Sequence, residues 1–205
     1  MKAVLLDLGG VIIDIDPRRT LQAWADAAGA DVAQVSSRWA IDATYEAHET
    51  NRIGFTELTA HLSKRLGISI SQQAWLDGWN QLFLEEFAGV VARIEEAARR
   101  VPLFVYTNTN PEHQAEWETR YAKSLQPFRK IYVSSEIGLR KPYVESYRWV
   151  ANDMGFAPED IMFLDDNTAN IKGAQEAGMQ TLHVTGSDVT EALLDKVIDH
   201  FPLDQ

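Results

Sequence analysis

Residues 1–14, MKAVLLDLGGVIID, decide the fold class of this 205-residue chain. The residues from Lys2 to Ile13 form a short apolar run with two glycines near its middle. Such a run is typical of a parallel strand that is covered on both faces. Because Asp7 interrupts the run and no small-residue cleavage site follows it, we interpret the segment as a buried strand. A signal peptide or a membrane span would lack this acid.

Four further apolar runs lie in the second half of the chain, and a helical pattern separates each run from the next. The runs are Leu103–Tyr106, Ile131–Val133, Ile161–Leu164 and Thr181–Val184. The helical patterns are Pro111–Leu125, Pro142–Met154, Thr168–Ala177 and Asp188–Ile198. Alternation of this kind predicts an α/β fold with a Rossmann-like parallel sheet that is wrapped by helices.

Roughly 90 residues without a strand-like run separate the first strand from the second, which is too long for a simple crossover. The predicted helices of this segment are Pro17 to Gly29 with Asp16 as cap, Asp31–Glu49, Thr56–Leu66 and Ser71–Phe87. Its aromatic side chains Trp75, Trp79 and Phe83, spaced four apart, favour a helix core over a ligand shelf. The sequence therefore predicts a helical domain, residues 16–87, inserted into a core of residues 1–15 and 88–205.

The composition excludes several classes of protein. The chain has 19 Lys and Arg against 30 Asp and Glu, a net charge of −11, which argues against a nucleic-acid surface and against binding to an anionic membrane. It has no cysteine, so disulfides, thiolate metal sites and a cysteine nucleophile are excluded. With 45% hydrophobic residues the composition is that of an ordinary globular protein, and we expect a cytoplasmic location.

Acidic residues follow two of the predicted strands. Asp7 ends the first apolar run, and Asp165 and Asp166 end the fourth. Parallel strands present their carboxyl ends at one edge of a sheet, so these carboxylates are expected to converge and to need a positive charge between them. Mg²⁺ is the usual ion when a phosphate shares such a site. The alternative of a turn or helix cap is serious for Asp166, just before the helix at Thr168, and weak for Asp7.

Three other residues fit an anionic ligand. Thr107 and Asn108 end the second strand, where a hydroxyl and backbone N–H groups can hold phosphate oxygens. Lys141 precedes a predicted helix and can pair with Asp7 and a phosphate together. Taken singly, Thr107 and Asn108 are better explained by a turn and cap before Pro111, and Lys141 by a solvated surface position. The conjunction of all these residues in this order favours a phosphate site.

The order of DLGGVIID (7–14), YTNTN (106–110), GLRKP (138–142) and FLDDNTANIKGA (163–174) resembles the haloacid dehalogenase-like (HAD) hydrolase superfamily. The resemblance covers essentially the whole chain and implies a HAD-like core with a helical, C1-type cap domain. The tracts DLGGVIIDIDPRR (7–19) and HETNRIG (48–54) are similar to the bacterial alpha-D-glucose-1-phosphate phosphatase branch. The implied function is a Mg²⁺-dependent phosphatase of small phosphorylated metabolites, with sugar phosphates such as glucose 1-phosphate as expected substrates.

The resemblance also implies a role for each position. Asp7 is the expected nucleophile that forms an aspartyl-phosphate, and Lys141 neutralises charge on it and on the phosphate. Thr107 and Asn108 hold the transferred phosphoryl group. The expected Mg²⁺ ligands are Asp7, Asp166, Asp165 directly or through water, and the backbone carbonyl of Gly9. A carboxylate nucleophile is already ionised at pH 7 and needs no activating base.

One departure concerns Gly9, where most phosphatases of this family carry a second Asp as acid and base. Loss of such a group typically costs ~10²–10⁴ in rate. Water, the substrate or a cap residue then has to move the proton; Glu49 and His48 are the cap candidates, although a solvated pair is the plainer interpretation. A 2-haloacid dehalogenase and a catalytically inactive phosphate-binding protein are the alternative functions. The acidic pair Asp165 and Asp166 counts against the dehalogenase. The inactive protein is disfavoured because the chain retains all four residue types of the site, at Asp7, Thr107, Lys141 and Asp166.

A few remaining polar residues receive minor predictions. Asn170, one helical turn after Asp166, is expected either to hold a metal-bound water or to cap a backbone group. Asp14 and Asp16 are interpreted as turn and cap residues. The histidines that show no mutual metal spacing, and therefore receive no role, are His61, His113, His183 and His200.

Overall fold

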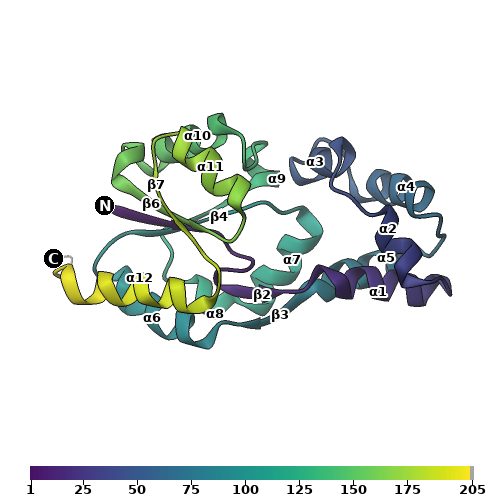
Figure 1. Ribbon diagram of the computed structural model, residues 1–205, viewed down its shortest axis with the longest axis horizontal. Coiled ribbons are helices and arrows are strands. Elements are labelled where there is room, and N and C mark those ends of the chain that lie inside the picture. Colours follow the sequence, from purple (N-terminus) through teal and green to yellow (C-terminus); the bar gives the residue numbers. More distant parts are fainter. Residues whose placement is uncertain (204–205) are drawn as a thin grey trace.

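The structure is a computed structural model that describes residues 1–203. Its centre is a five-stranded sheet with the spatial order β5-β4-β1-β6-β7 (Figure 1), in which every neighbouring pair is parallel. The strands are β1 (Ala3–Leu6), β4 (Leu103–Thr107), β5 (Lys130–Val133), β6 (Ile161–Asp165) and β7 (Gln180–His183). The predicted α/β fold with a parallel sheet is confirmed. The strand order reverses at β1, and in such sheets ligands bind beyond the carboxyl ends of the strands at this point.

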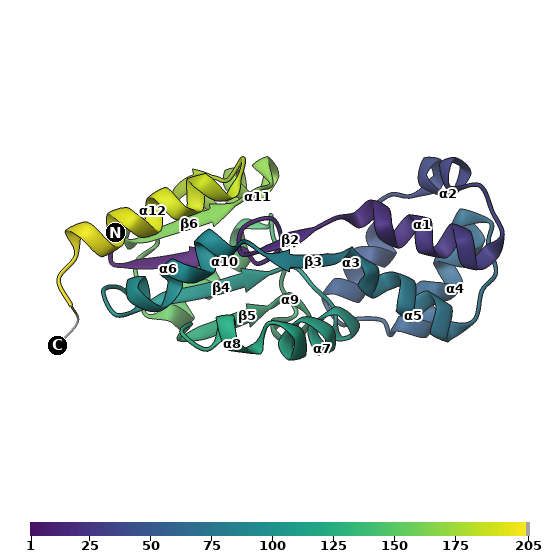
Figure 2. The ribbon, with the colours of Figure 1, turned by 90° about the horizontal axis from the view of Figure 1, so that it is seen from below.

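Helices cover both faces of the sheet (Figures 1 and 2). On one face lie α6 (Ala88–Ala98), α7 (Pro111–Arg120), α8 (Ala122–Leu125) and α12 (Ser187–His200). On the other lie α10 (Val144–Met154) and α11 (Thr168–Glu176), and the short α9 (Ser134–Ile137) follows β5. Both faces are therefore shielded from water, which explains why β1 and β4 consist of buried residues throughout.

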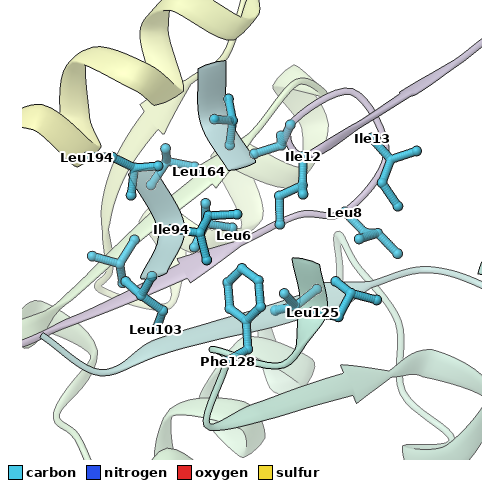
Figure 3. Packing of buried hydrophobic residues seen from close by; sticks show 14 of the residues in the cluster. Leu6, Leu8, Ile12, Ile13, Ile94, Leu103, Leu125, Phe128, Leu164 and Leu194 are labelled. Carbon is cyan, nitrogen blue, oxygen red and sulfur yellow. The ribbon is translucent and has the colours of Figure 1, made fainter. Parts of the chain in front are cut away.

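The larger apolar cluster of the core lies between the sheet and the helices α6, α7, α8 and α12 that cover one of its faces (Figure 3). Leu6, Leu103 and Leu164 come from three adjacent strands and are fully buried. They pack in one cluster with Ile94 of α6 and Leu194 of α12. Burying one such side chain contributes roughly 1.5–3 kcal/mol, so this layer fixes the sheet from which the polar strand ends project.

Residues between the first and second core strands form a separate helical unit at one end of the molecule (Figure 2). Its helices are α1 (Pro17–Ala28), α2 (Val32–Arg38), α3 (Ala43–Glu49), α4 (Phe55–Leu66) and α5 (Gln72–Trp79). The unit has its own apolar cluster, in which Trp24 stacks on Trp79 with ring centroids 5.3 Å apart and meets Trp75 edge-on at 4.7 Å. The interpretation of Trp75 and Trp79 as core residues is thereby confirmed.

The helical unit is joined to the core by a two-stranded antiparallel ribbon of β2 (Ile13–Ile15) and β3 (Phe83–Glu86). This ribbon corrects two predictions, because the sequence suggested no strand in this segment and a continuous helix over Ser71–Phe87. The helix ends at Trp79, and a 3-10 turn over Asn80–Leu82 leads into β3. The pairing of Ile15 with Phe83 joins residues far apart in the chain, which no local pattern reveals.

Three other element boundaries differ from the sequence predictions. The expected helix Asp31–Glu49 is two helices, because the chain is extended at Trp39 and Asp42 starts α3 by accepting hydrogen bonds from the Thr44 and Tyr45 N–H groups. Pro111–Leu125 is likewise divided at Tyr121. The run from Lys2 to Ile13 is not one strand: β1 ends at Leu6, a turn follows Asp7, and β2 begins at Ile13. Within residues 1–203, none of the helices combines the length and apolar character that crossing a bilayer demands.

Candidate active site

Asp7 lies at the carboxyl end of the central strand. The register pairs Leu6 with Val105 on one side and with Leu164 on the other, and the Asp7 N–H donates to the Leu164 carbonyl at 2.8 Å. This pairing places Asp7 beside the acidic pair that ends β6. The Asp7 Oδ1 atom accepts a hydrogen bond from the Leu8 N–H at 2.7 Å, which orients the carboxylate.

The turn after Asp7 needs glycine at one position. Gly10 has a φ of +74°, and a Cβ atom there would lie 2.5 Å from Asp166 Oδ2. Glycine therefore allows both the left-handed backbone and the close approach of this turn to the acidic pair. Gly9 carries no such positive φ, and it lines the cavity beside Asp7.

The two acids that end β6 have different surroundings. Asp165 is fully buried and accepts hydrogen bonds from the Asn167 N–H at 2.8 Å and from the Asn170 side chain at 3.0 Å. Asp166 is exposed to the cavity. One oxygen from each of Asp7, Asp165 and Asp166 lies within 4.8 Å of the others. The three carboxylates that the sequence singled out are thus brought together.

Lys141 provides the positive charge between these acids. Its Nζ atom lies 2.8 Å from Asp7 Oδ1 and 2.7 Å from Asp165 Oδ2, and the side chain is 1% exposed. Burial alone would lower the pKa of Lys141, but the carboxylates of Asp165 and Asp7 outweigh it and raise the pKa above its ordinary value. The lysine is therefore charged at neutral pH, and its interpretation as a solvated surface residue is wrong.

The carboxylates together carry more negative charge than one lysine balances. Burial, and next the nearby Asp165 and Asp166, raise the pKa of Asp7 above its ordinary value even though Lys141 lowers it. Three oxygen donors that converge in this way fit a hard divalent cation such as Mg²⁺, whose charge would restore the ionised form of Asp7.

The Asn108 side chain links the carboxyl end of β4 to the loop before α10. The Asn108 Oδ1 atom accepts from the Lys141 N–H, and its Nδ2 group donates to the Lys141 carbonyl, both at 2.9 Å. Asn108 therefore holds the backbone of Lys141, and its amide is engaged before any phosphate binds. Thr107 is buried and lines the cavity.

A cavity of about 390 Å³ lies between the strand ends and the helical unit. Asp7, Thr107, Lys141 and Asp166 line it from the core. Glu49, the last residue of α3, lines it from the helical unit. The sequence predicted a roof of this kind over the strand ends, and the lining shows that both parts of the chain contribute to one cavity.

Charged and polar contacts fasten α3 to the core. The Arg140 Nε group donates to Glu49 Oε2 at 2.8 Å, and Arg140 Nη1 donates to Glu46 Oε1 at 2.7 Å. His48 Nε2 lies 3.0 Å from Glu112 Oε2 of α7. His48 and Glu49 are both buried, so the interpretation of these two residues as a solvated pair is wrong.

Several side chains of the site have functions in the structure that the sequence did not reveal. Asn170 donates to both oxygens of Asp165, so its amide contacts an acid where the sequence suggested a metal-bound water or a backbone group. Arg140 was missed although it stands next to Lys141. His113 is buried with Nε2 at 3.0 Å from the Trp79 carbonyl, and burial lowers its pKa to about 3. Asp16 caps α1 as predicted.

Comparisons with known proteins agree with this geometry. The family model of the haloacid dehalogenase-like hydrolases matches residues 1–178. The chain is 24% identical over 191 residues to the D-ribitol-5-phosphate phosphatase of Bacteroides thetaiotaomicron, covering 88% of this chain and 90% of the relative. It is 26% identical over 191 residues to the sesquiterpene phosphatase astK of Aspergillus oryzae, covering 92% of both chains.

Solved structures show the same fold. A HAD family enzyme from Bacteroides thetaiotaomicron, an Asp-to-Ala mutant in complex with magnesium and inorganic phosphate, superposes with a TM-score of 0.78 at 24% identity. The superposition covers 89% of this chain and 93% of that one. A HAD-like family hydrolase from Porphyromonas gingivalis gives a TM-score of 0.83 at 22% identity and covers 98% of each chain.

The parallel sheet, the acidic cluster at its carboxyl edge and the lysine within it agree with the hydrolase class that the family model and the relatives show. Because the family model spans most of the chain, the protein belongs to the haloacid dehalogenase-like hydrolases. Its curated relatives include phosphatases that match almost the whole chain.

Proposed function

We propose that this protein is a Mg²⁺-dependent phosphatase that forms an aspartyl-phosphate on Asp7. The observation that carries the proposal is the double contact of Lys141, whose Nζ atom meets both Asp7 and Asp165 inside a group of three carboxylates. The charge of Lys141 favours the ionised form of Asp7, the divalent cation that the three acids would hold favours it further, and Asp7 lines the cavity. Such a carboxylate is a competent nucleophile toward phosphorus.

The remaining roles follow the positions predicted from the sequence. An oxygen of Asp7 attacks phosphorus, and Lys141 compensates the negative charge on Asp7 and on the phosphoryl oxygens. Thr107, with the backbone at Asn108, holds the transferred group. Asp7, Asp165, Asp166 and the carbonyl of Gly9 would hold Mg²⁺, which supplies positive charge at the phosphoryl oxygens.

The substrate in this proposal is a small phosphorylated metabolite, and sugar phosphates such as glucose 1-phosphate are tested first. The phosphatase relatives above and a cavity of about 390 Å³ support a small organic leaving group. The helical unit, residues 16–87, would act as a cap over the core of residues 1–15 and 88–205 and so would select the substrate. A cytoplasmic location completes the proposal.

The acidic cluster also separates this function from its alternative. A 2-haloacid dehalogenase binds a carboxylate substrate and needs no cation, so Asp165 and Asp166 would repel that substrate. A phosphate accompanied by a divalent cation suits the same three acids. The phosphatase is therefore the function that the geometry supports best.

The test is the hydrolysis of p-nitrophenyl phosphate with Mg²⁺ and with a chelator. We expect turnover that requires Mg²⁺ and falls by about 10⁴-fold or more in Asp7→Asn, because the amide is no nucleophile. A panel of aldose 1-phosphates and polyol phosphates then ranks the substrates. Chloride release from 2-chloropropionate that continues in chelator, without phosphatase activity, would contradict the proposal.

A further inference from the structure

A phosphatase of this kind has to move a proton twice. The leaving oxygen needs a proton when its bond to phosphorus breaks, and the water that hydrolyses the aspartyl-phosphate has to lose one. The position two residues after Asp7 is Gly9, which has no side chain to do this. Another group in the cavity has to supply the function if leaving groups are ordinary alcohols.

The cavity contains few groups that can exchange a proton. Asp7 is committed to phosphorus, and Asp166 belongs to the acidic cluster. Lys141 contacts two carboxylates, and the Arg140 guanidinium has N–H donors but no acceptor atom that could take up a proton. Among the lining residues that the structure describes, this leaves His113 and Glu49.

His113 does not fit the role. Its Nε2 atom lies 3.0 Å from the Trp79 carbonyl and its Nδ1 atom lies 3.2 Å from the Asn110 side chain, so both ring nitrogens are occupied. Burial lowers its pKa to about 3, and the ring is neutral at physiological pH. A neutral imidazole whose two nitrogens are engaged has neither a proton nor a lone pair to offer.

Glu49 is held at the cavity through its backbone carbonyl and through its carboxylate. Its backbone carbonyl accepts from Ser134 Oγ at 2.7 Å, and the same hydroxyl group contacts the backbone of Thr109 near the end of β4. Its carboxylate accepts from Arg140 Nε at 2.8 Å, next to Lys141 in the chain. The side chain is therefore fixed to the strand ends that hold the reacting groups, although it comes from the helical unit.

We propose that Glu49 is the general acid and base of the reaction, in place of the acid that position 9 lacks. Its environment suits a proton donor, because burial raises the pKa of Glu49 above its ordinary value against the charge of Arg140, a hydrogen bond with the Tyr45 hydroxyl and the charge of Lys141. Arg140 donates to one oxygen of this carboxyl group and so fixes its position at the cavity.

Glu49 gives up a proton in the first step of the reaction and takes one back in the second. In the first step an Asp7 oxygen bonds to phosphorus, the bond from phosphorus to the leaving oxygen breaks, and protonated Glu49 gives its proton to that oxygen. In the second step water attacks the phosphorus of the aspartyl-phosphate, the bond from phosphorus to the Asp7 oxygen breaks with its electron pair returning to the Asp7 carboxylate, and the water gives one proton to the Glu49 carboxylate. Inorganic phosphate leaves, and both carboxyl groups return to their starting forms.

This inference rests on the proposed function, and its test compares two substrates of similar shape. Phenyl phosphate releases a phenol with a pKa of about 10, whereas p-nitrophenyl phosphate releases a far weaker base that leaves without a proton. In Glu49→Gln we expect kcat/KM for phenyl phosphate to fall on the order of 10²-fold, while kcat/KM for p-nitrophenyl phosphate changes less than about threefold.

The same variant has a second, kinetic signature. With p-nitrophenyl phosphate, Glu49→Gln should release one p-nitrophenolate per active site in a rapid burst and then turn over slowly. The burst arises because phosphorylation of Asp7 proceeds while attack by water lacks its base. A residue with only a structural role would slow both substrates alike and would show no accumulated phosphoenzyme.

The matched control is Glu46→Gln. Glu46 stands on the same helix and pairs with the same Arg140, but it does not line the cavity of Asp7. We expect this control to leave the ratio of the two kcat/KM values unchanged. An equal loss for both substrates in Glu49→Gln, or an unchanged ratio, would overturn the role of Glu49. Absence of turnover of p-nitrophenyl phosphate by the wild type would instead overturn the proposed function.

Discussion

Lys141 determines the electrostatics of the site. It is buried among acids, and its ammonium group is the positive charge that Asp7 and Asp165 share. Removing one member of such a buried group typically costs about 3–5 kcal/mol, because a partner keeps an uncompensated charge. The bidentate contact of Asn108 with the Lys141 backbone prevents this charge from moving out of place.

Gly10 gives a prediction about the metal site. In Gly10→Ala the new methyl group meets Asp166 Oδ2 and the residue also has to keep a positive φ. We expect the free energy of unfolding to fall by about 1–2 kcal/mol and the Mg²⁺ concentration for half-maximal activity to rise about tenfold, because Asp166 is displaced. Urea unfolding and a Mg²⁺ titration of p-nitrophenyl phosphate hydrolysis measure the two effects.

Gly29→Ala serves as the control for this prediction. Gly29 has a φ of +62° and no atom within 4 Å of a Cβ built there. It should show the same order of destabilisation with an unchanged Mg²⁺ titration. A Gly10→Ala variant that binds Mg²⁺ like the wild type would show that the close approach to Asp166 has no part in holding the ion.

At the scale of residues, the sequence predicts the charged groups of the site and misses their partners. Asp7 and Asp165 stand at the ends of apolar runs, which a parallel sheet brings together, and Lys141 precedes a predicted helix. The contact of Asn170 with Asp165 and the contact of Arg140 with Glu49 depend on side-chain directions in three dimensions. Such directions leave no mark in the spacing of residues along the chain.

Helix α3 is the element that carries Glu49, and one side chain starts it. Asp42 accepts from the N–H groups of Thr44 and Tyr45, lies 2.8 Å from His61 Nε2 and also pairs with Arg65. A cap of this kind typically contributes about 1 kcal/mol to helix stability. The start of α3 is therefore fixed independently of its attachment to the core.

The cap of α3 can be tested against the cap of α2. Both Asp42→Ala and Asp31→Ala remove an N-cap. We expect Asp31→Ala to lower the free energy of unfolding by about 1 kcal/mol, and Asp42→Ala to lower it further because Asp42 also pairs with His61 and Arg65. Only Asp42→Ala should also lower kcat/KM for phenyl phosphate, by about tenfold, because it loosens the helix that ends at Glu49. Steady-state assays of the two variants make the comparison, and equal activities would contradict it.

At the scale of elements, the sequence predicts helix ends from capping residues and buried strands from apolar runs, but it does not predict β3. Asp16 caps the start of α1 and Gly29 caps its end, as the sequence predicted. The residues of β3 continue the aromatic spacing of the preceding helix, so a local pattern extends the helix through Phe83. Pairing with β2, roughly 70 residues earlier, overrides that pattern.

For the whole molecule, the contacts between the helical unit and the core include buried titratable groups. His113 of α7 lies against Trp79 of the helical unit, with ring centroids 4.7 Å apart. Burial lowers the pKa of His113 to about 3, against an ordinary value of about 6.5. The folded protein therefore binds fewer protons than the unfolded chain between these two values.

The sign of the pH dependence follows from this difference. The stability that comes from neutral His113 is fully present above pH ~6.5 and is lost as the pH falls toward 3, at up to about 1.4 kcal/mol per pH unit. Urea unfolding at pH 7 and pH 5 should therefore show a smaller decrease for His113→Gln than for the wild type. His200→Gln, at an exposed position, should keep the wild-type decrease. A His113→Gln variant with the full decrease would assign the acid sensitivity to other groups.

The ribbon of β2 and β3 has a consequence for how this chain can diversify. Ile15 pairs with Phe83, and the Asp16 N–H donates to the Leu82 carbonyl at 2.8 Å, so the whole helical unit occupies the place of a hairpin turn. Segments of other lengths can be grafted between these two residues without shifting the register of any strand. Exchange of the helical unit would therefore keep Asp7, Lys141 and Asp165 of the core in place and would replace Glu49, which the unit carries.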